Sequence, residues 1–226
     1  MRPEASALGP ALGPALAGVC ESLGLAVDAA TQARLLAYLA LLQRWNATYN
    51  LTAVREPAEM LTQHLADCLA VVGPLRRQLG SSAACRILDV GSGGGLPGVV
   101  LAALEPAWSV TCVDAVGKKA AFIRQAAVEL GLRNLSAEHA RVESLKAGGF
   151  DLIVSRAFAS LADFVTLTRP LLAPTGVWAA MKGKTPTAEL VELDALPAGI
   201  DVFHVEPITV PGLDAERCIV WMRQQA

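Results

Sequence analysis

The sequence predicts an α/β protein with a doubly wound, mostly parallel sheet, and three observations support this class. From residue 86 onward, short runs rich in β-branched residues alternate with stretches of helical periodicity, as in parallel strands joined by helices. The first run enters a glycine-rich loop. The last two runs have only a short loop between them, so they should pair antiparallel. The sheet is therefore expected to end in an antiparallel hairpin.

The part of the chain before this sheet predicts helices. Apolar residues recur at helical spacing over residues 35–45 and again over residues 60–72. Pro57 suits the first turn of the second helix, because its missing N–H is not needed there. We therefore expect an N-terminal helical cap over residues 16–80, followed by an α/β domain over residues 84–226.

The first 15 residues are expected to differ from the cap. Residues 1–15 are apolar but contain Pro10 and Pro14, which disfavour a helix, so the segment should be a flexible tail. No apolar run reaches the roughly 18 residues that a membrane-spanning helix needs. We therefore expect no membrane association.

The α/β part is expected to gather its ligand site at one edge of the sheet. Strands are expected at residues 86–90, 109–114, 135–140, 150–155, 176–183, 200–205 and 217–223. Helices should begin near residues 95, 117 and 161, with a weaker helix after the fifth strand. In such sheets the ligand lies beyond the carboxyl ends of the strands, at the topological switch point. This rule places four segments around one crevice: 89–96, Asp114, 141–143 and 155–158.

Composition and charge limit the classes of function. The 226 residues are 53% hydrophobic and 18% charged, which is typical of a globular protein. A net charge of −2 creates no strong overall attraction to nucleic acid or membrane, so such binding needs a local patch. The five cysteines are scattered without a CxxC pair, which argues against zinc or a redox dithiol and favours a reducing cytoplasm. Nothing in the sequence suggests a metal.

The loop at residues 91–98 is compatible with two kinds of ligand. The spacing G-x-G-x-x-G within residues 93–98 matches the fingerprint of dinucleotide sites, which bind a pyrophosphate. However, Asp89 lies two residues before the first glycine, Gly91. A carboxylate there repels a pyrophosphate but suits a sulfonium ligand that also carries an ammonium group, as S-adenosylmethionine does. Asp89 alone is explained equally well as a cap of the turn.

Two later strand ends add to this site. Asp114 ends the second strand, where a carboxylate accepts the ribose hydroxyls of an adenosine in NAD and S-adenosylmethionine alike. After the third strand, Val142 can pack on an adenine face and Glu143 can meet its exocyclic amine. A helix cap with a surface glutamate explains these two residues equally well. Together with the hairpin-ended sheet, the pattern favours S-adenosylmethionine.

Basic residues near the same edge suggest contact with an acceptor. Arg156 follows the fourth strand, whose end faces the methyl group in doubly wound methyltransferases. It can bridge a carboxylate, stack on a base or hold a phosphate, and a structural salt bridge to an aspartate is the competing interpretation. Any one of the other basic residues can be simply solvated, but as a group they predict a rim that follows RNA phosphates. The residues of this predicted rim are Lys118, Lys119, Arg124, Arg141 and Lys182.

These stretches together resemble the ribosomal RNA small-subunit methyltransferase G family (RsmG, or GidB). The resemblance runs in order and at family-like spacing from about residue 30 to 185, and "LDAERCIVWMR" near the end is also similar. The combination of "WNATYNLT" with "SRAFA" makes it specific. The stretches that carry it are "RWNATYNLTAVREPAEMLTQHLADCL", "DVGSGGGLPG", "VDAVGKKAAFIRQ", "RVESL", "SRAFASL" and "MKG".

The resemblance implies a class I (Rossmann-like) methyltransferase fold with a helical cap. It also implies transfer of a methyl group from S-adenosyl-L-methionine to N7 of a guanine in small-subunit (16S) ribosomal RNA. Cofactor contacts carried over from the family fall on Gly91, Leu96, Asp114, Val142, Glu143 and Arg156, and Arg156 is also the expected catalytic residue. The loop chemistry adds Asp89, Gly93 and Gly95. Ala115 departs from the family, which often has serine after this aspartate.

The implied chemistry needs no general base, because guanine N7 carries an in-plane lone pair and no proton. The small net charge favours RNA within a 30S or pre-30S particle over naked RNA as the substrate. Three alternatives stay open from sequence alone. They are a methyltransferase for a small molecule or protein, an NAD-dependent oxidoreductase, and a non-catalytic RNA-binding module.

Overall fold

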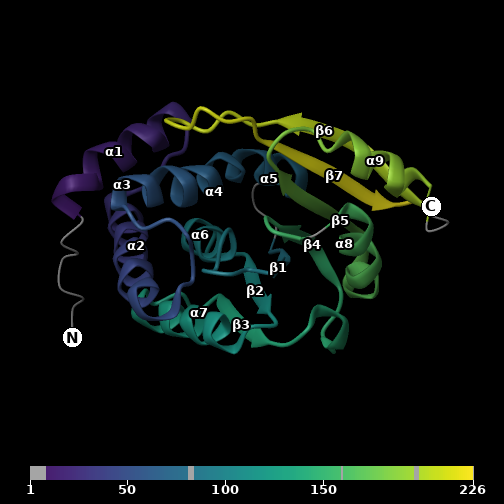
Figure 1. Cartoon of the computed structure of the whole chain (residues 1–226), viewed down its shortest axis with the longest axis horizontal. Helices are drawn as coiled ribbons and strands as arrows, with labels where there is room; N and C mark the ends of the chain where they lie inside the picture. Colours follow the sequence, from purple (N-terminus) through teal and green to yellow (C-terminus); the bar gives the residue numbers. More distant parts are fainter. Residues whose placement is uncertain (1–8, 81–83, 159, 196–198, 226) are drawn as a thin grey trace.

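A central sheet organises the molecule, as Figure 1 shows. The structure is a computed structural model that describes residues 9–80, 84–158, 160–195 and 199–225. In these described residues, seven strands form one sheet in the order β3-β2-β1-β4-β5-β7-β6. Their bounds are Arg86–Val90 (β1), Ser109–Asp114 (β2), Leu135–His139 (β3), Phe150–Ser155 (β4), Leu172–Lys182 (β5), Ile200–Pro207 (β6) and Cys218–Gln224 (β7).

The predicted fold class is confirmed. Strands β1 to β5 pair in parallel, and β7 pairs antiparallel with both β5 and β6, so the sheet ends in the expected hairpin. Strands β1, β2 and β4 coincide with their predicted ranges. Strand β5 begins at Leu172, earlier than predicted, because Leu172 pairs with Phe150 ahead of an irregularity in the β4–β5 register.

Helices flank the sheet on both sides. The N-terminal helices are α1 (Gly9–Ser22), α2 (Ala29–Tyr49), α3 (Pro57–Met60), the π-helix η1 (Leu61–Ala66), α4 (Asp67–Ala70) and α5 (Val72–Leu79). The later ones are α6 (Gly98–Leu104), α7 (Gly117–Glu129), the 3-10 helix η2 (Val142–Ser144), α8 (Leu161–Thr168), the 3-10 helix η3 (Arg169–Leu171) and α9 (Thr187–Asp194). As expected, Pro57 stands in the first turn of α3.

The flexible tail predicted for residues 1–15 is wrong for its second half, which belongs to helix α1. Pro14 lies inside this helix and removes one backbone hydrogen bond. Leu12 and Leu16 are buried against the rest of the protein, and their burial offsets that cost. Residues 1–8 lie outside the described part of the chain.

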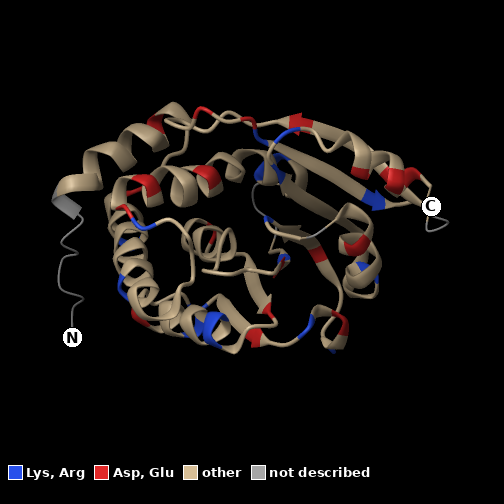
Figure 2. Cartoon of the chain, in the orientation of Figure 1, with Lys and Arg blue, Asp and Glu red and all other residues tan. Residues whose placement is uncertain are grey.

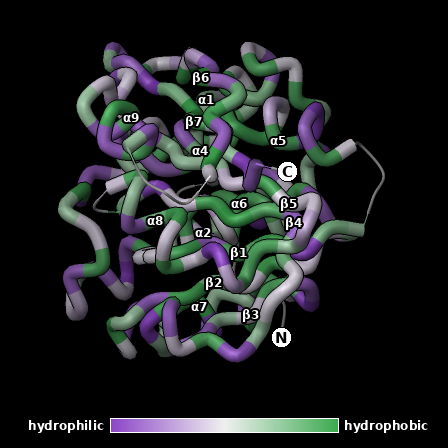
Figure 3. The backbone as a smooth tube through the Cα atoms, turned by 90° about the vertical axis from the view of Figure 1, so that its right-hand side faces the viewer, coloured by the Kyte–Doolittle hydropathy of each residue, from purple (hydrophilic) through white to green (hydrophobic). Residues whose placement is uncertain are grey.

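Two hydrophobic cores cover the two faces of the sheet. Ile87 of β1 faces a core that contains α1, α2, α4, α5, α6 and α7, whereas Leu88 faces the core under α8 and α9. In Figure 3 the strands in the middle of the sheet are largely hydrophobic, as expected for strands buried on both faces. The expected cap and one face of the sheet therefore share a core. The division into domains at residues 80–84 stays a prediction.

This arrangement positions the loops that follow the parallel strands. Strand β1 lies between β2 and β4, so the topological switch point is at its carboxyl end. The antiparallel pairing places Cys218, the first residue of β7, beside Lys182, the last residue of β5. Residues from β1, β2, β4, β5 and the start of β7 thus meet at one edge. Among the described helices, none is both long and apolar enough to cross a membrane.

Gly98, at the start of α6, provides a test of the packing under the glycine loop. A Cβ atom at this position would overlap the Cys112 sulfur and lie 2.8 Å from Asp89 Oδ2. Both neighbours are fully buried, so we expect Gly98→Ala to lower the free energy of unfolding by about 1–3 kcal/mol in urea denaturation. Gly13→Ala is the control, since no atom lies within 4 Å of its added Cβ. Equal losses in both variants would contradict this account.

Candidate functional site

Two of the cavities lined by described residues lie at the carboxyl ends of the parallel strands. The first, the β1–β2 cavity, has a volume of about 310 Å³ and is lined by residues that include Gly91, Asp114, Val142, Glu143 and Phe158. The second, the β4–β5 cavity, has a volume of about 360 Å³ and is lined by residues that include Gln63, His64, Asp67, Arg156, Lys182 and Arg217. Both lie at the ends of parallel strands of the same sheet, in which β1 is the neighbour of both β2 and β4.

Asp114 is held rigidly at the β1–β2 cavity. Its Oδ2 accepts the Gly93 N–H at 2.9 Å, and its Oδ1 accepts the Val116 N–H at 2.8 Å. Lys119 Nζ lies 3.8 Å from Oδ2. Each carboxylate oxygen retains a lone pair for a further donor. The carboxylate is therefore oriented in advance to accept hydroxyl groups.

The glycines of the loop have different roles. Gly91 lines the cavity with φ +67°, and no atom lies within 4 Å of a Cβ built on it, so the backbone there is open to a ligand. Gly95 also has a positive φ, but an added Cβ would lie 2.6 Å from Val99 Cγ2. Gly95 therefore permits close packing of the loop on α6. Leu96 is buried beside it.

Asp89 lies beneath the loop and is fully buried. Its Oδ2 accepts the Gly98 N–H at 2.8 Å, which is the capping role that the sequence left open. Its Oδ1 has no hydrogen-bond partner among the described residues. Burial raises the pKa of Asp89 to about 7, although the Gly98 N–H and the Arg156 charge oppose this shift. The loop thus covers a carboxyl group with one unused acceptor.

The raised pKa of Asp89 predicts a pH-dependent stability. The folded protein binds this proton more tightly than the unfolded chain, whose aspartates titrate near pH 3.8. The stability that the neutral carboxyl contributes is fully present below about pH 4 and is lost as the pH rises to about 7. Between these limits we expect Asp89→Asn to gain about 2–4 kcal/mol relative to wild type, because one pKa unit is about 1.4 kcal/mol. Urea denaturation at stepped pH measures this, and a constant difference would contradict it.

Four of the residues predicted to bind the cofactor line the β1–β2 cavity: Gly91, Asp114, Val142 and Glu143. Val142 is buried in η2, and together with Phe158 and Leu167 it gives the cavity an apolar wall. Glu143 is half-exposed and lies 3.8 Å from Arg141, whose side chain is 80% exposed. Of the other five predicted residues, Arg156 lies elsewhere, and Asp89, Gly93, Gly95 and Leu96 belong to the loop and the strand beneath it.

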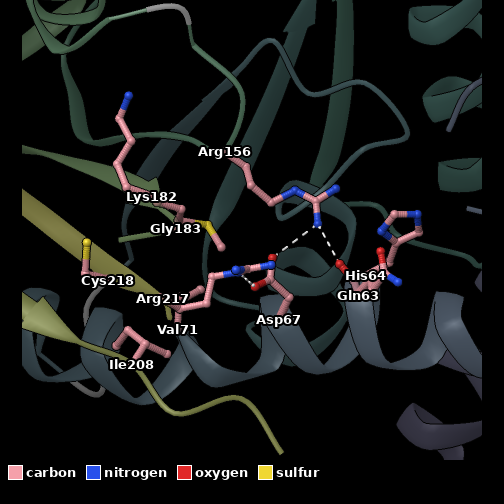
Figure 4. A pocket seen from close by; sticks show the side chains of 11 residues that line it. Gln63, His64, Asp67, Val71, Arg156, Lys182, Gly183, Ile208, Arg217 and Cys218 are labelled. Carbon is pink, nitrogen blue, oxygen red and sulfur yellow. Dashed lines mark hydrogen bonds and ion pairs between the residues drawn. The ribbon is translucent and has the colours of Figure 1, made fainter. Parts of the chain in front are cut away.

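Arg156 lies in the β4–β5 cavity and not in the β1–β2 cavity (Figure 4). Its Nη1 donates to Asp67 Oδ2 at 3.3 Å and to the Gln63 carbonyl at 3.1 Å. Arg217 donates from Nε to the other oxygen of Asp67, at 2.8 Å. The salt bridge that we considered as the competing interpretation of Arg156 is therefore present. Arg156 also remains 26% exposed and lines the cavity.

His64 connects this cavity to the loop that follows α2. Its Nε2 lies 2.9 Å from Thr52 Oγ1, while its buried Nδ1 has no hydrogen-bond partner among the described residues. Burial and the nearby Arg156 charge lower the pKa of His64 to about 4, so its ring is neutral at neutral pH. Asn46 fixes the loop, since its amide accepts the Thr52 N–H and donates to the Val54 carbonyl. The "WNATYNLT" stretch thus supports a wall of the β4–β5 cavity.

Asp67 and Arg217 were not predicted as site residues, and His64 lies within residues 60–72, for which only a helix was predicted. A signal was available, because His64 and Asp67 are polar residues at the same helical spacing as the apolar residues Met60 and Val71, and buried polar residues are uncommon. His64 belongs to the π-helix η1, and Asp67 follows it directly. Such π-helical turns occur frequently at functional sites.

The predicted basic rim falls into separate groups, since Lys118, Lys119 and Arg124 lie on α7, where Figure 2 shows blue segments, whereas Lys182 ends β5. Lys118 is exposed on α7, next to Lys119. Arg124 on the same helix donates from Nε to the Ala137 carbonyl of β3, at 2.9 Å. Lys182 lines the β4–β5 cavity and pairs with Glu189 at 2.8 Å. Its contact with RNA stays a prediction.

Comparisons with known proteins agree with this architecture. The GidB family model, described as rRNA small subunit methyltransferase G, matches residues 31–219. A protein named ribosomal RNA small subunit methyltransferase G from Methylibium petroleiphilum is 61% identical over 215 residues, which cover 95% of this chain and 96% of that protein. A protein of the same name from Leptothrix cholodnii is 61% identical over 211 residues, which cover 93% of this chain and 94% of that protein.

A solved structure supports the fold independently. A SAM-dependent methyltransferase from Aquifex aeolicus matches with a TM-score of 0.55 at 16% identity, covering 72% of this chain and 92% of that chain. At this identity the likeness shows the fold alone, which is that of the class I methyltransferases. The family match, the two relatives and the fold lead to one conclusion. This chain belongs to the rRNA small subunit methyltransferase G family.

Proposed function

We propose that this protein transfers a methyl group from S-adenosyl-L-methionine to N7 of a guanine in small-subunit (16S) ribosomal RNA. The observation that carries the proposal is the pair of cavities at the same edge of the sheet. One holds the preoriented Asp114 carboxylate, and the other is lined by Arg156 and Arg217. Because the chain belongs to this family, the first cavity is proposed to hold the adenosyl cofactor and the second to hold the guanine.

The residues of the β1–β2 cavity fit the proposed cofactor. Asp114 can accept the ribose hydroxyls, and Val142 with Phe158 forms an apolar wall suited to adenine. Gly91 leaves the loop backbone open. Beneath the loop, Asp89 Oδ1 is a buried acceptor with no hydrogen-bond partner in the described part of the chain, which suits a cationic ligand. When bound, the cofactor supplies a methyl group on a positively charged sulfur.

The β4–β5 cavity is the proposed site for the acceptor base. N7 of guanine has its own lone pair, so the residues around it need only orient the base and exclude water. His64 is neutral and buried, and no proton transfer is assigned to it. Arg156 and Arg217 supply positive charge for a base or its phosphate. The base has to leave its stack, or come from a loop, to reach this cavity.

The proposed substrate is RNA within a 30S or pre-30S particle. With a net charge of −2, the protein has little long-range attraction for naked RNA. Lys118, Lys119 and Arg141, which lie beside the β1–β2 cavity, are proposed to contact phosphates, together with Arg124 and Lys182. Such a substrate is found in the cytoplasm, so the enzyme is proposed to act there.

Transfer of labelled methyl from S-adenosylmethionine to purified 30S particles that lack the modification tests this proposal. After digestion of the RNA to nucleosides, the label is expected in 7-methylguanosine, at no more than one per particle. Protein-free 16S RNA should accept label more slowly than the particle. Label in another nucleoside or in ribosomal protein would reject the proposed chemistry.

A further inference from the structure

We infer that Asp67 is a positioning residue that turns Arg156 and Arg217 away from N7 of the acceptor guanine. The inference rests on the proposed function and goes beyond it, because Asp67 acts here through the two arginines that it holds. It assigns the buried carboxylate between the two arginines a purpose specific to methylation at N7.

The geometry around Asp67 is unusual for an ion pair. Asp67 is the first residue of α4, its side chain is only 5% exposed, and each of its oxygens accepts from a different arginine. Arg156 comes from the end of β4, and Arg217 precedes β7. One carboxylate thus holds two guanidinium groups that come from different parts of the chain.

Backbone carbonyls complete the fixation of both arginines. Arg156 Nη1 donates to the Gln63 carbonyl at 3.1 Å, and Arg217 Nη1 donates to the Glu216 carbonyl at 2.8 Å. In each guanidinium, the Nη1 group is therefore engaged by the protein. Each arginine is therefore held in one orientation, in which its Nη1 group donates to an acceptor of the protein. Figure 4 shows both side chains converging on Asp67.

The chemistry of guanine gives this arrangement its significance. The commonest specific contact of arginine with guanine is a bidentate pair of hydrogen bonds to O6 and N7. In that pair the N7 lone pair is occupied, so it cannot attack a methyl group. A cavity lined by two freely moving arginines would therefore hold guanine in an unproductive way. Asp67 prevents this by holding Arg156 through its Nη1 and Arg217 through its Nε.

The charges in the cavity lead to the same conclusion. Asp67 neutralises one of the two guanidinium charges, and Glu189 neutralises Lys182. The cavity keeps an excess of about one positive charge from these groups, which suits a single phosphate or the electron-rich edge of one base. Without Asp67 the cavity would bind RNA more tightly and less productively.

Asp67→Asn tests the inference, since the amide is isosteric but carries no charge to hold the two arginines. Turnover on 30S particles is expected to fall about 10–100-fold, the range of one bidentate base contact, while KM stays equal or decreases. Guanosine 5′-monophosphate and its 7-deaza analogue then probe N7 directly, by NMR titration in the presence of S-adenosylhomocysteine. Wild type should bind the two nucleotides within about twofold, whereas Asp67→Asn should prefer the nucleotide that has N7 by at least about fivefold.

Two further variants separate positioning from folding. Asp67→Glu keeps the carboxylate, so it should recover much of the turnover lost in Asp67→Asn and show no preference for N7. Glu105→Gln is the control, because it removes a comparable half-buried ion pair, with Arg76 at 2.5 Å, that lies outside both cavities. This variant should leave the turnover and the nucleotide preference unchanged. A thermal melt shows whether Asp67→Asn is folded. If it is not, the same nucleotide titration is carried out on Asp67→Ala, with added S-adenosylhomocysteine to stabilise the folded state.

The outcomes distinguish a failure of the inference about Asp67 from a failure of the proposed function. A raised KM without any preference for N7 in the folded variant would overturn the inference and leave Asp67 a structural residue. Wild type that transfers label to a different nucleoside would instead reject the proposed function, whatever the variants do. A preference for N7 confined to the Asp67→Asn or Asp67→Ala variant supports the inference.

Discussion

Asp114→Ala is expected to weaken the binding of S-adenosylhomocysteine at least about 100-fold, since hydrogen bonds to a charged group contribute about 1.5–3 kcal/mol each. The carboxylate has two functions that the variant loses together. It can accept the ribose hydroxyls, and it fixes the Gly93 and Val116 backbone around the cavity. Isothermal titration calorimetry measures the effect.

Asp151→Ala is the matched control for this loss. Asp151 also accepts a backbone N–H, from Arg86 at 2.8 Å, but it does so at the amino edge of the sheet. We expect this variant to bind S-adenosylhomocysteine as wild type does. An Asp114→Ala variant with an affinity within about threefold of wild type would show that the β1–β2 cavity does not hold the adenosyl group, since a lost charged hydrogen bond costs more than that.

Arg156→Ala is expected to lower kcat/KM for methyl transfer to 30S particles at least about 100-fold, because a positioned charged contact is lost. Its affinity for S-adenosylhomocysteine should change little, because Arg156 lies in the β4–β5 cavity. Asp67 keeps Arg217 as a partner, so the variant should fold. The expected result therefore separates binding of the acceptor from binding of the cofactor.

Arg223→Ala is the control for this second experiment. Arg223 also forms an ion pair, with Asp201 at 2.7 Å, but at the end of β7 remote from both cavities. Filter-based transfer assays and calorimetry on both variants give the comparison. Unchanged turnover in Arg156→Ala would remove this residue from the proposed acceptor site. Loss of cofactor binding would instead indicate that Arg156 contacts the cofactor, as the family resemblance implies.

The sheet was predictable because its strands carry their signal locally. Strands β1, β2 and β4 are short apolar runs buried on both faces, and their ranges follow directly from the sequence. The chain before residue 16 was not predictable in this way. There, the rule that proline breaks helices failed, because burial of Leu12 and Leu16 in a tertiary contact offsets a local penalty.

The two cavities also differ in how far local sequence signals predict them. The β1–β2 cavity could be predicted, because its residues follow neighbouring strands and carry a familiar glycine and carboxylate pattern. The β4–β5 cavity depends on Asp67 and Arg217, which are 150 residues apart and meet only in the folded protein. The π-helical turn before Asp67 leaves no mark in the apolar periodicity.

Asp89 shows a limit of motif chemistry. Its spacing from the glycines suggested an acid that faces the cofactor, yet the side chain is fully buried and one oxygen caps the Gly98 N–H. Spacing identified the residue but not the direction of its side chain, which depends on how closely α6 packs under β1. A role toward a cationic ligand stays a prediction that rests on the unpartnered Oδ1.

A crystal structure of the protein with S-adenosylhomocysteine tests the central claim most directly, because it locates the cofactor relative to both cavities. We predict ribose hydroxyls on the Asp114 carboxylate, adenine beside Val142, and the sulfur directed toward the cavity that contains Arg156. A ligand bound elsewhere, or a dinucleotide whose diphosphate rests on the Gly91 loop while S-adenosylhomocysteine does not bind, would contradict the account.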